Sequence, residues 1–207
     1  MDSFGPGLSG RVIEVGAGNG NLTRFLARRC ESVVALEPNQ GLCDQLHALA
    51  LPDVRVVNAS LDDFPPGEER FDSALMVNVL EHIEEDLEAL KKVRELLRPG
   101  GRLNLLVPAH PSLYSPLDRR FGHHRRYTKG RLTEVMAAAG YEVGLARYFN
   151  PIGALGWFFL LKVPRRQSLS STSVVLTERV AVPIGKWLER RGDPLFGQSL
   201  IAVGLRP

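Results

Sequence analysis

The chain has 207 residues, of which 44% are hydrophobic and 24% charged, and its formal net charge is +3. This length suits one domain with a single core. The small positive excess lacks the concentrated basic field of a dedicated nucleic-acid-binding protein, so no nucleic-acid partner is expected. Cys30 and Cys43 have no metal-ligand spacing. This pattern predicts no structural zinc site and favours a reducing cytoplasm.

The sequence also gives no sign of a membrane span. The N-terminus has no basic region followed by an apolar run, so no secretory signal is expected. The longest apolar stretch, residues 151–161, is shorter than the roughly 20 residues that cross a bilayer.

Short apolar, β-branched runs alternate with segments of helical spacing along the chain. We expect strands at 11–15, 32–36, 54–57, 71–77, 102–107, 141–148 and 199–205, and helices at 22–29, 42–49, 85–97 and 128–139. Such alternation implies right-handed crossovers and a mostly parallel sheet with helices on both faces. We therefore expect a doubly wound α/β fold in one domain over residues 1–207. Its ligands should lie beyond the carboxyl ends of the strands.

A glycine-rich turn follows the first expected strand. Gly16, Gly18 and Gly20 lie between a strand and a helix, where missing side chains let backbone amides approach a ligand closely. The dinucleotide fingerprint GxGxxG requires glycine at position 21, where Asn21 stands. The spacing GxGxG therefore predicts a ligand site and disfavours a dinucleotide.

Four segments in chain order resemble class I S-adenosylmethionine-dependent methyltransferases, in particular the bacterial type 11/12, ubiquinone-biosynthesis-like group that acts on small molecules. They are Glu14 to Gly20, the acidic Glu37 at the end of the second strand, Leu80-Glu81-His82 after the fourth strand, and Arg98-Pro99-Gly100-Gly101 before the fifth. The resemblance implies an enzyme with S-adenosylmethionine as cofactor. It also implies a Rossmann-like sheet of seven strands whose last strand is antiparallel.

The resemblance further implies a cofactor site along the ends of the first four strands. Glu37 would bind both ribose hydroxyls, a task that suits a carboxylate because its two oxygens only accept hydrogen bonds. Ser60 replaces a frequent Asp at the adenine contact, which leaves the Leu61 backbone for that contact. The expected cofactor-binding residues are Glu14, Gly16, Ala17, Gly18, Gly20, Glu37, Pro38, Ser60, Leu61 and Asn78.

Methyl transfer from a sulfonium is an in-line displacement, so the protein mainly positions the nucleophile and, where needed, removes its proton. No metal is required, and none is expected. His82 follows the fourth strand, close to the expected methyl donor, and its imidazole suits a general base. A helix-start histidine bonded to backbone is the alternative interpretation. His123 and Tyr127 complete the expected catalytic set.

Residues 108–128 form the first expected acceptor-side segment, and their Pro-Ala-His to Gly-His-x-Arg-Arg-Tyr pattern belongs to the same resemblance. Arg125 and Arg126 carry forked donors suited to a carboxylate or phosphate, which suggests an anionic acceptor. Alternatively, these arginines pair with Asp118 or with helix carboxylates and pin the loop down. The expected substrate-binding residues are His110, Tyr114, Asp118, Arg125 and Arg126.

A second acceptor-side segment is expected at 150–195. Ten residues precede the first strand, so we expect the N-terminal helix that covers the cofactor in many relatives to be absent or trimmed. Three interpretations of 150–166 stay open: a substrate lid, a dimer face, or a patch on a membrane surface. A lid is favoured because periodic aromatic runs are more often core. A homodimer or peripheral membrane contact through 150–190 remains an alternative for this otherwise cytoplasmic protein.

The function that these observations favour is methyl transfer to an O or N atom of a small-molecule acceptor, which is anionic or lipid-like by hypothesis. A non-catalytic, cofactor-binding partner of another methyltransferase is the first alternative. An NAD-dependent oxidoreductase is disfavoured by the glycine spacing and by the lack of a Tyr-x-x-x-Lys set. An RNA methyltransferase is disfavoured because no Asn-Pro-Pro-Tyr motif follows the fourth strand. The acceptor atom itself is not predicted, because O-, N- and C-methylation share one scaffold.

Overall fold

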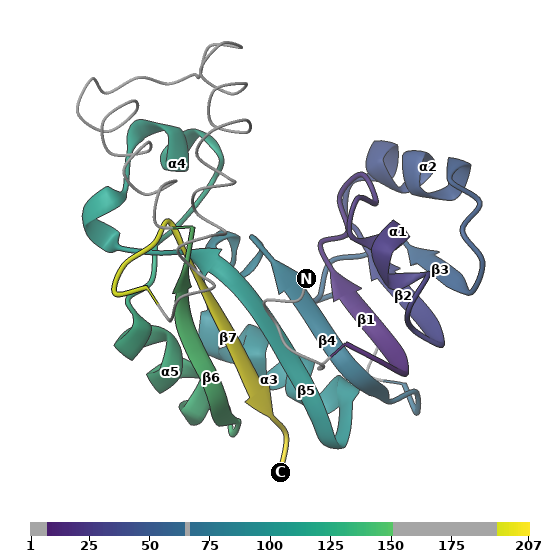
Figure 1. The fold of residues 1–207 in the computed structure, drawn as a ribbon. Helices are drawn as coiled ribbons and strands as arrows, with labels where there is room; N and C mark the ends of the chain where they lie inside the picture. Colours follow the sequence, from purple (N-terminus) through teal and green to yellow (C-terminus); the bar gives the residue numbers. More distant parts are fainter. Residues whose placement is uncertain (1–7, 65–66, 151–193) are drawn as a thin grey trace.

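The computed structural model describes residues 8–64, 67–150 and 194–207. Seven strands form one sheet in the order β3-β2-β1-β4-β5-β7-β6 (Figure 1). β7 runs antiparallel to both of its neighbours, and the other pairs are parallel. The expected doubly wound sheet with an antiparallel last strand is therefore confirmed. The strands are β1 (Arg11–Val15), β2 (Ser32–Leu36), β3 (Val54–Val57), β4 (Phe71–Val77), β5 (Leu97–Pro108), β6 (Glu142–Phe149) and β7 (Ser199–Leu205).

Helices lie on both faces of this sheet. Successive residues of a strand point to opposite faces, so each face has its own apolar contacts with the helices. Ile13 of β1 belongs to a core shared with Leu90 of α3 and Leu132 of α5, and Figure 1 shows α3 and α5 on the same side of the sheet. Its neighbour Val12 packs on the other face with Leu26 of α1. The helices are α1 (Thr23–Leu26), α2 (Gln40–Ala48), α3 (Asp86–Leu96), α4 (Pro116–Arg120) and α5 (Lys129–Ala138).

Several element boundaries differ from those expected. β5 begins at Leu97 instead of residue 102, because the expected turn Arg98-Pro99-Gly100-Gly101 lies within the strand, where its pairing with β4 is irregular. Gly100 adopts a φ of 77°, and its amide donates to the carbonyl of Arg206 at 2.8 Å. The chain end thus pairs with this turn and keeps it in the sheet. The 3-10 helix Leu80–His82 and α4 are additional short elements.

The strand order places the candidate site. The chain leaves β1 toward β2 and β3 on one side and then crosses to β4 on the other side, which opens a crevice at the carboxyl ends of β1 and β4. Gly16 follows β1 with a φ of 74°, and Asn78 follows β4 with a φ of 53°. α4 lies above the carboxyl end of β5 (Figure 1). Both expected ligand-binding loops therefore leave the same edge of the sheet.

Two expectations concern parts of the chain that the structure does not describe. The apolar run in 150–166, with its lid, dimer and membrane interpretations, lies outside the described residues apart from Asn150. The same holds for most of the acceptor-side segment 150–195. Within the described ranges, every helix is too short or too polar to cross a membrane.

The N-terminal cap of α5 generates a stability prediction. Thr128 accepts a hydrogen bond from the Arg131 amide at 3.1 Å, and Gly140 follows the helix with a φ of 87°, as the sequence predicts. Thr128→Ala should lower the free energy of unfolding by about 1 kcal/mol, because the amide loses its partner. Urea denaturation measures this change. Glu134→Ala, at an exposed position of the same helix, is the control and should change stability little, and equal losses in both variants would contradict the cap.

Candidate active site

The turn between β1 and α1 is tied to the end of β2. The amides of Gly16 and Ala17 both donate to the carbonyl oxygen of Leu36 at 2.9 Å. A Cβ atom on Gly16 would come within 2.5 Å of Val79 Cγ2. Glycine is therefore required at position 16 both by the backbone conformation and by the close approach of the β4 loop.

Glu37 holds the same turn from the other side. Its carboxylate is buried, and it accepts from the amides of Gly18 at 2.8 Å and of Asn39 at 3.0 Å, one on each oxygen. Each carboxylate oxygen has two lone pairs, so both retain capacity for a further donor. Glu37 thus shapes the glycine turn and remains able to accept from ligand hydroxyls.

Glu14 lies beneath the turn. Its carboxylate is 2% exposed and accepts from the hydroxyl of Thr23, the first residue of α1, at 2.7 Å. Burial raises the pKa of Glu14 to about 7, an effect that the hydrogen bond from Thr23 partly offsets. In this structure Glu14 anchors the start of α1 to β1, and it is not among the residues that line the adjacent cavity.

A first cavity, of about 510 Å³, opens beside the glycine turn. We call it the donor cavity. Leu42, Val79 and Ile83 give it apolar walls, which sequence reasoning missed because they carry no polar signature. Ser60 also lines it, with its hydroxyl engaged by Asp63 at 2.5 Å. Six of the ten expected cofactor-binding residues line this cavity: Gly16, Glu37, Pro38, Ser60, Leu61 and Asn78.

A second cavity, of about 560 Å³, lies next to the first. We call it the acceptor cavity. The two cavities have Asn78 and His82 in common, so they meet at the end of β4. Gln198 and Ser199 were not expected, because they come from the antiparallel strand β7 and its approach, far along the chain. The acceptor cavity is lined by Asn78, His82, Pro108, Phe121, His123, Arg126, Gln198 and Ser199.

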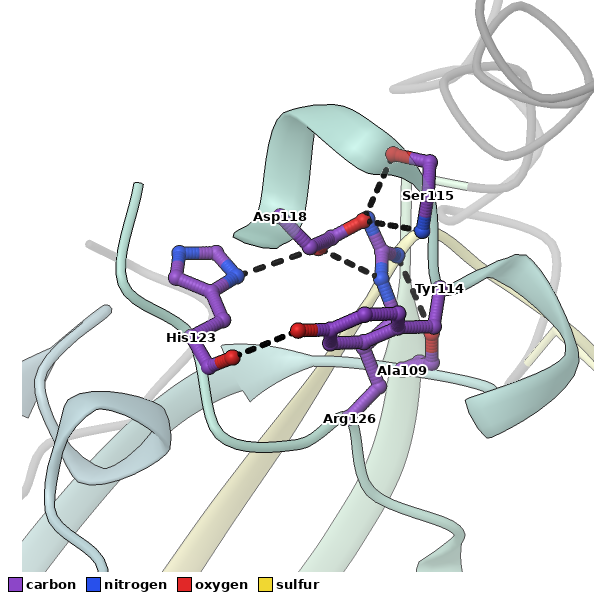
Figure 2. A network of polar contacts seen from close by, with 6 residues as sticks. All are labelled: Ala109, Tyr114, Ser115, Asp118, His123 and Arg126. Atoms are coloured by element: carbon purple, nitrogen blue, oxygen red, sulfur yellow. Dashed lines mark hydrogen bonds and ion pairs between the residues drawn. The ribbon is translucent and has the colours of Figure 1, made fainter. Parts of the chain in front are cut away.

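A fully buried carboxylate organises the loop above β5 (Figure 2). Asp118 accepts from the amide and the hydroxyl of Ser115, both at 2.8 Å, and from Arg126 Nε at 2.8 Å. Its other contact is His123 Nδ1 at 3.0 Å. Burial alone would raise the pKa of Asp118, but the hydrogen bonds and the Arg126 charge hold it at about 2. Since ionised Asp118 only accepts, the proton of this hydrogen bond lies on His123 Nδ1.

Further contacts dock this loop onto the sheet. Tyr114 donates its hydroxyl to the His123 carbonyl at 2.7 Å, and Arg126 Nη1 donates to the Ala109 carbonyl at 3.2 Å (Figure 2). The His124 amide donates to the Glu81 carbonyl at 2.8 Å. Tyr114, expected to bind the acceptor, thus fixes the backbone beside His123.

Three expected site residues have internal roles in the structure. Arg125 pairs with Asp86 Oδ2 at 3.0 Å and also bonds the Glu84 carbonyl, so it pins the loop to the start of α3. Tyr127 is fully buried, and its hydroxyl donates to Asp86 at 3.1 Å, while burial raises its pKa. Asp118 is likewise enclosed by protein donors. In the structure, Tyr127 and Asp118 contact protein partners, and Arg125 holds the loop to the start of α3.

His110 stands apart from both cavities. It has a φ of 59°, and its ring stacks on Tyr148 with centroids 4.7 Å apart. Burial lowers the pKa of His110, and the charge of Arg126 lowers it further. Its ring packs against β6 and is not among the residues that line the acceptor cavity.

Two histidines meet where the cavities join. The rings of His82 and His123 have centroids 4.6 Å apart at an interplanar angle of 85°. Burial lowers the pKa of His82, and the nearby His123 lowers it further, so His82 is neutral at pH 7. Beside them Glu81 is fully buried, burial raises its pKa to about 7, and neither carboxylate oxygen has a hydrogen-bond partner. Two imidazole rings and one carboxylate therefore lie close together at this point.

Residues 12–101, from β1 into β5, match the methyltransferase domain family. This part of the chain is therefore similar to a methyltransferase domain. The matched residues include the glycine turn, Glu37 and the Leu80–His82 helix. An uncharacterized methyltransferase of Mycobacterium tuberculosis is 35% identical over 106 residues, which are 51% of this chain and 43% of that protein.

The resemblance extends beyond the matched domain. An uncharacterized protein of Mycobacterium tuberculosis is 33% identical over 191 residues, 87% of this chain and 62% of its own length. The chain thus spans less than two thirds of these relatives. The crystal structure of an S-adenosylmethionine-dependent methyltransferase from Mesorhizobium loti aligns with a TM-score of 0.69 at 16% identity, covering 99% of this chain and 94% of that one. This likeness confirms the Rossmann-like fold.

The raised pKa of Glu14 generates a prediction of pH dependence. Because the carboxyl has a pKa of about 7 when folded and about 4.5 when unfolded, the unfolded chain binds fewer protons between these values. The free energy of unfolding should therefore fall as pH rises from about 4.5 to 7. Glu14→Gln should flatten this fall, as urea denaturation across that range would measure. Glu88→Gln, on the exposed side of α3, should keep the wild-type slope, and an unchanged slope in Glu14→Gln would contradict the assignment.

Proposed function

We propose that this chain binds S-adenosylmethionine in the donor cavity and transfers its methyl group to a small molecule in the acceptor cavity. The observation that carries the proposal is the junction of the two cavities at Asn78 and His82. A lone pair of the acceptor attacks the methyl carbon, the carbon–sulfur bond breaks, and S-adenosylhomocysteine leaves. The acceptor atom then loses its proton, or has lost it beforehand, so that the product is neutral at that atom.

The donor cavity fits the parts of this cofactor. The apolar side chains of Leu61 and Ile83 suit the adenine ring, and the carboxylate of Glu37 suits the ribose hydroxyls, which are donors. The glycine turn lets the cofactor approach the backbone at Gly16 and Gly18. A cofactor of this kind is named for the Mesorhizobium loti structure that shares the fold.

The acceptor cavity fits a small, partly apolar molecule. Its volume of about 560 Å³ lies within the usual range for small-molecule sites. Phe121 and Pro108 offer apolar contact, while Gln198 and Ser199 offer hydrogen bonds. The charge of Arg126 is balanced by Asp118 at 2.8 Å, so the cavity does not require an anionic acceptor. A hydroxylated or amine-bearing ring compound is the class that these walls favour, and His82 and His123 stand where its reacting atom must be activated.

Cofactor binding is tested by calorimetric titration. The wild-type chain should bind S-adenosylmethionine, and Glu37→Gln should weaken binding about 10- to 100-fold, since a hydrogen bond to a charged group contributes about 1.5–3 kcal/mol. Glu88→Gln should bind like the wild type, because Glu88 lies on the exposed face of α3 and pairs with Lys91. A wild-type chain that binds NAD and not S-adenosylmethionine would overturn the proposal.

Catalysis is tested with a panel of phenols, quinols and amines as methyl acceptors. For an accepted substrate, His82→Gln should lower kcat by at least about 100-fold, because His82 lines both cavities where the acceptor must lose its proton. His47→Gln, on α2 and remote from both cavities, should keep the wild-type kcat. Cofactor binding without turnover of any acceptor would instead support a non-catalytic partner of another methyltransferase.

A further inference from the structure

The carboxylate of Glu81 has an unusual environment. It is fully buried, and neither of its oxygens has a hydrogen-bond partner among the described residues. Removing a carboxylate from water without a compensating partner is costly, and buried polar atoms in folded proteins are nearly always satisfied. Glu81 lines neither cavity itself, but it is adjacent to His82, which lines both. An uncompensated carboxylate in this place indicates a missing positively charged or donor ligand.

The neighbours of Glu81 identify the class of that ligand. Glu81, His82 and His123 each offer one ligand atom, and these three atoms lie within 4.8 Å of one another. Two imidazoles and one carboxylate are donors typical of zinc and other divalent transition metals. In a tetrahedral site with metal–ligand bonds of about 2.0–2.2 Å, the ligand atoms of one ion lie about 3.3–3.6 Å apart. Side-chain movements of roughly an ångström would therefore bring these three atoms around one ion.

The surrounding contacts orient these ligands. His123 Nδ1 is held by Asp118 at 3.0 Å, which leaves Nε2 for a metal, as in the carboxylate–histidine–metal arrangement of many sites. The ring of His82 lies beside the backbone of Gly122, which opposes the lowering of the His82 pKa. The bond from the His124 amide to the Glu81 carbonyl, at 2.8 Å, keeps the loop beside the Leu80–His82 helix. The ligand set is thus pre-organised from two segments.

We propose that Glu81, His82 and His123 bind one divalent transition-metal ion, of the zinc or cobalt class, between the donor and acceptor cavities. Three protein ligands leave at least one coordination position open. This step rests on the proposed function: a hydroxyl of the acceptor occupies the open coordination position. Coordination lowers the pKa of the hydroxyl, which releases its proton to water, and its oxygen then bonds to the methyl carbon as the carbon–sulfur bond breaks. The histidines thereby activate the acceptor through the ion.

Metal binding is tested on tag-free protein stripped with a chelator and titrated with Co²⁺, whose d–d absorption reports coordination by protein ligands. About one Co²⁺ per chain should bind, and Zn²⁺ should displace it. His82→Gln, His123→Gln and Glu81→Gln should each weaken Co²⁺ binding by at least about 100-fold, since even residues that only support metal ligands contribute about 10- to 100-fold. His124→Gln and His47→Gln, which alter histidines outside the cluster, should bind Co²⁺ like the wild type.

The outcomes separate this inference from the proposed function, because S-adenosylmethionine binding is measured in the same metal-free samples. Intact cofactor binding without saturable Co²⁺ absorption would overturn the metal site alone. Co²⁺ binding that persists in both His82→Gln and His123→Gln, or that is lost in His124→Gln, would also overturn it. Co²⁺ binding without cofactor binding would overturn the proposed function and leave the metal site standing. Circular dichroism of each variant confirms that a lost signal is not lost folding.

Discussion

The reversal of strand order between β1 and β4 is the constraint on which the functional part of the molecule depends. Loops that leave neighbouring parallel strands in opposite directions cannot pack against each other along their whole length, so a crevice opens between them. In this chain the glycine turn lies on one side of the crevice and Asn78 on the other. The two cavities and the loops that line them lie at this crevice.

Two buried carboxylates hold the loops on either side of this crevice in place. Glu37 accepts two backbone amides and fixes the turn beside the donor cavity. Asp118 accepts from Ser115, His123 and Arg126 and fixes the loop beside the acceptor cavity. In both places a carboxylate serves because one small group satisfies several donors that would otherwise be buried without partners. The ionised state of Asp118 in turn selects the protonated nitrogen of His123.

The sequence was sufficient for the fold because local signals and topology agree. Alternating strand and helix patterns predict the parallel sheet, and the Thr128 cap and Gly140 bound α5 closely. Six of the ten expected cofactor-binding residues line one cavity, because they lie at or just after the carboxyl ends of strands β1 to β4. The ends of the helices and strands were less predictable. β5 includes Pro99 and Gly100 because the Gly100 amide donates to the carbonyl of the distant Arg206.

The acceptor side was harder to predict for a physical reason. Arg125 and Tyr127 have side chains that suit catalysis, yet Asp86 of α3 holds both of them. Ser199 reaches the cavity only because β7 pairs with β5. The cluster of Glu81, His82 and His123 joins two segments whose spacing matches no ligand pattern. Such contacts depend on tertiary packing, which one-dimensional motifs do not encode.

The shared wall at Asn78 and His82 bears on how this protein can diversify. The donor cavity is built from the ends of β1, β2 and β4, whereas the acceptor cavity draws on the α4 loop and β7. Phe121, Gln198 and Ser199 line the acceptor side and are absent from the donor lining. Under the proposed function, substitutions at these three positions would alter acceptor selectivity and leave the lining of the donor cavity unchanged. The two cavities are thus lined by largely separate sets of residues that meet at Asn78 and His82, and this separation offers directed evolution a compact set of positions to vary.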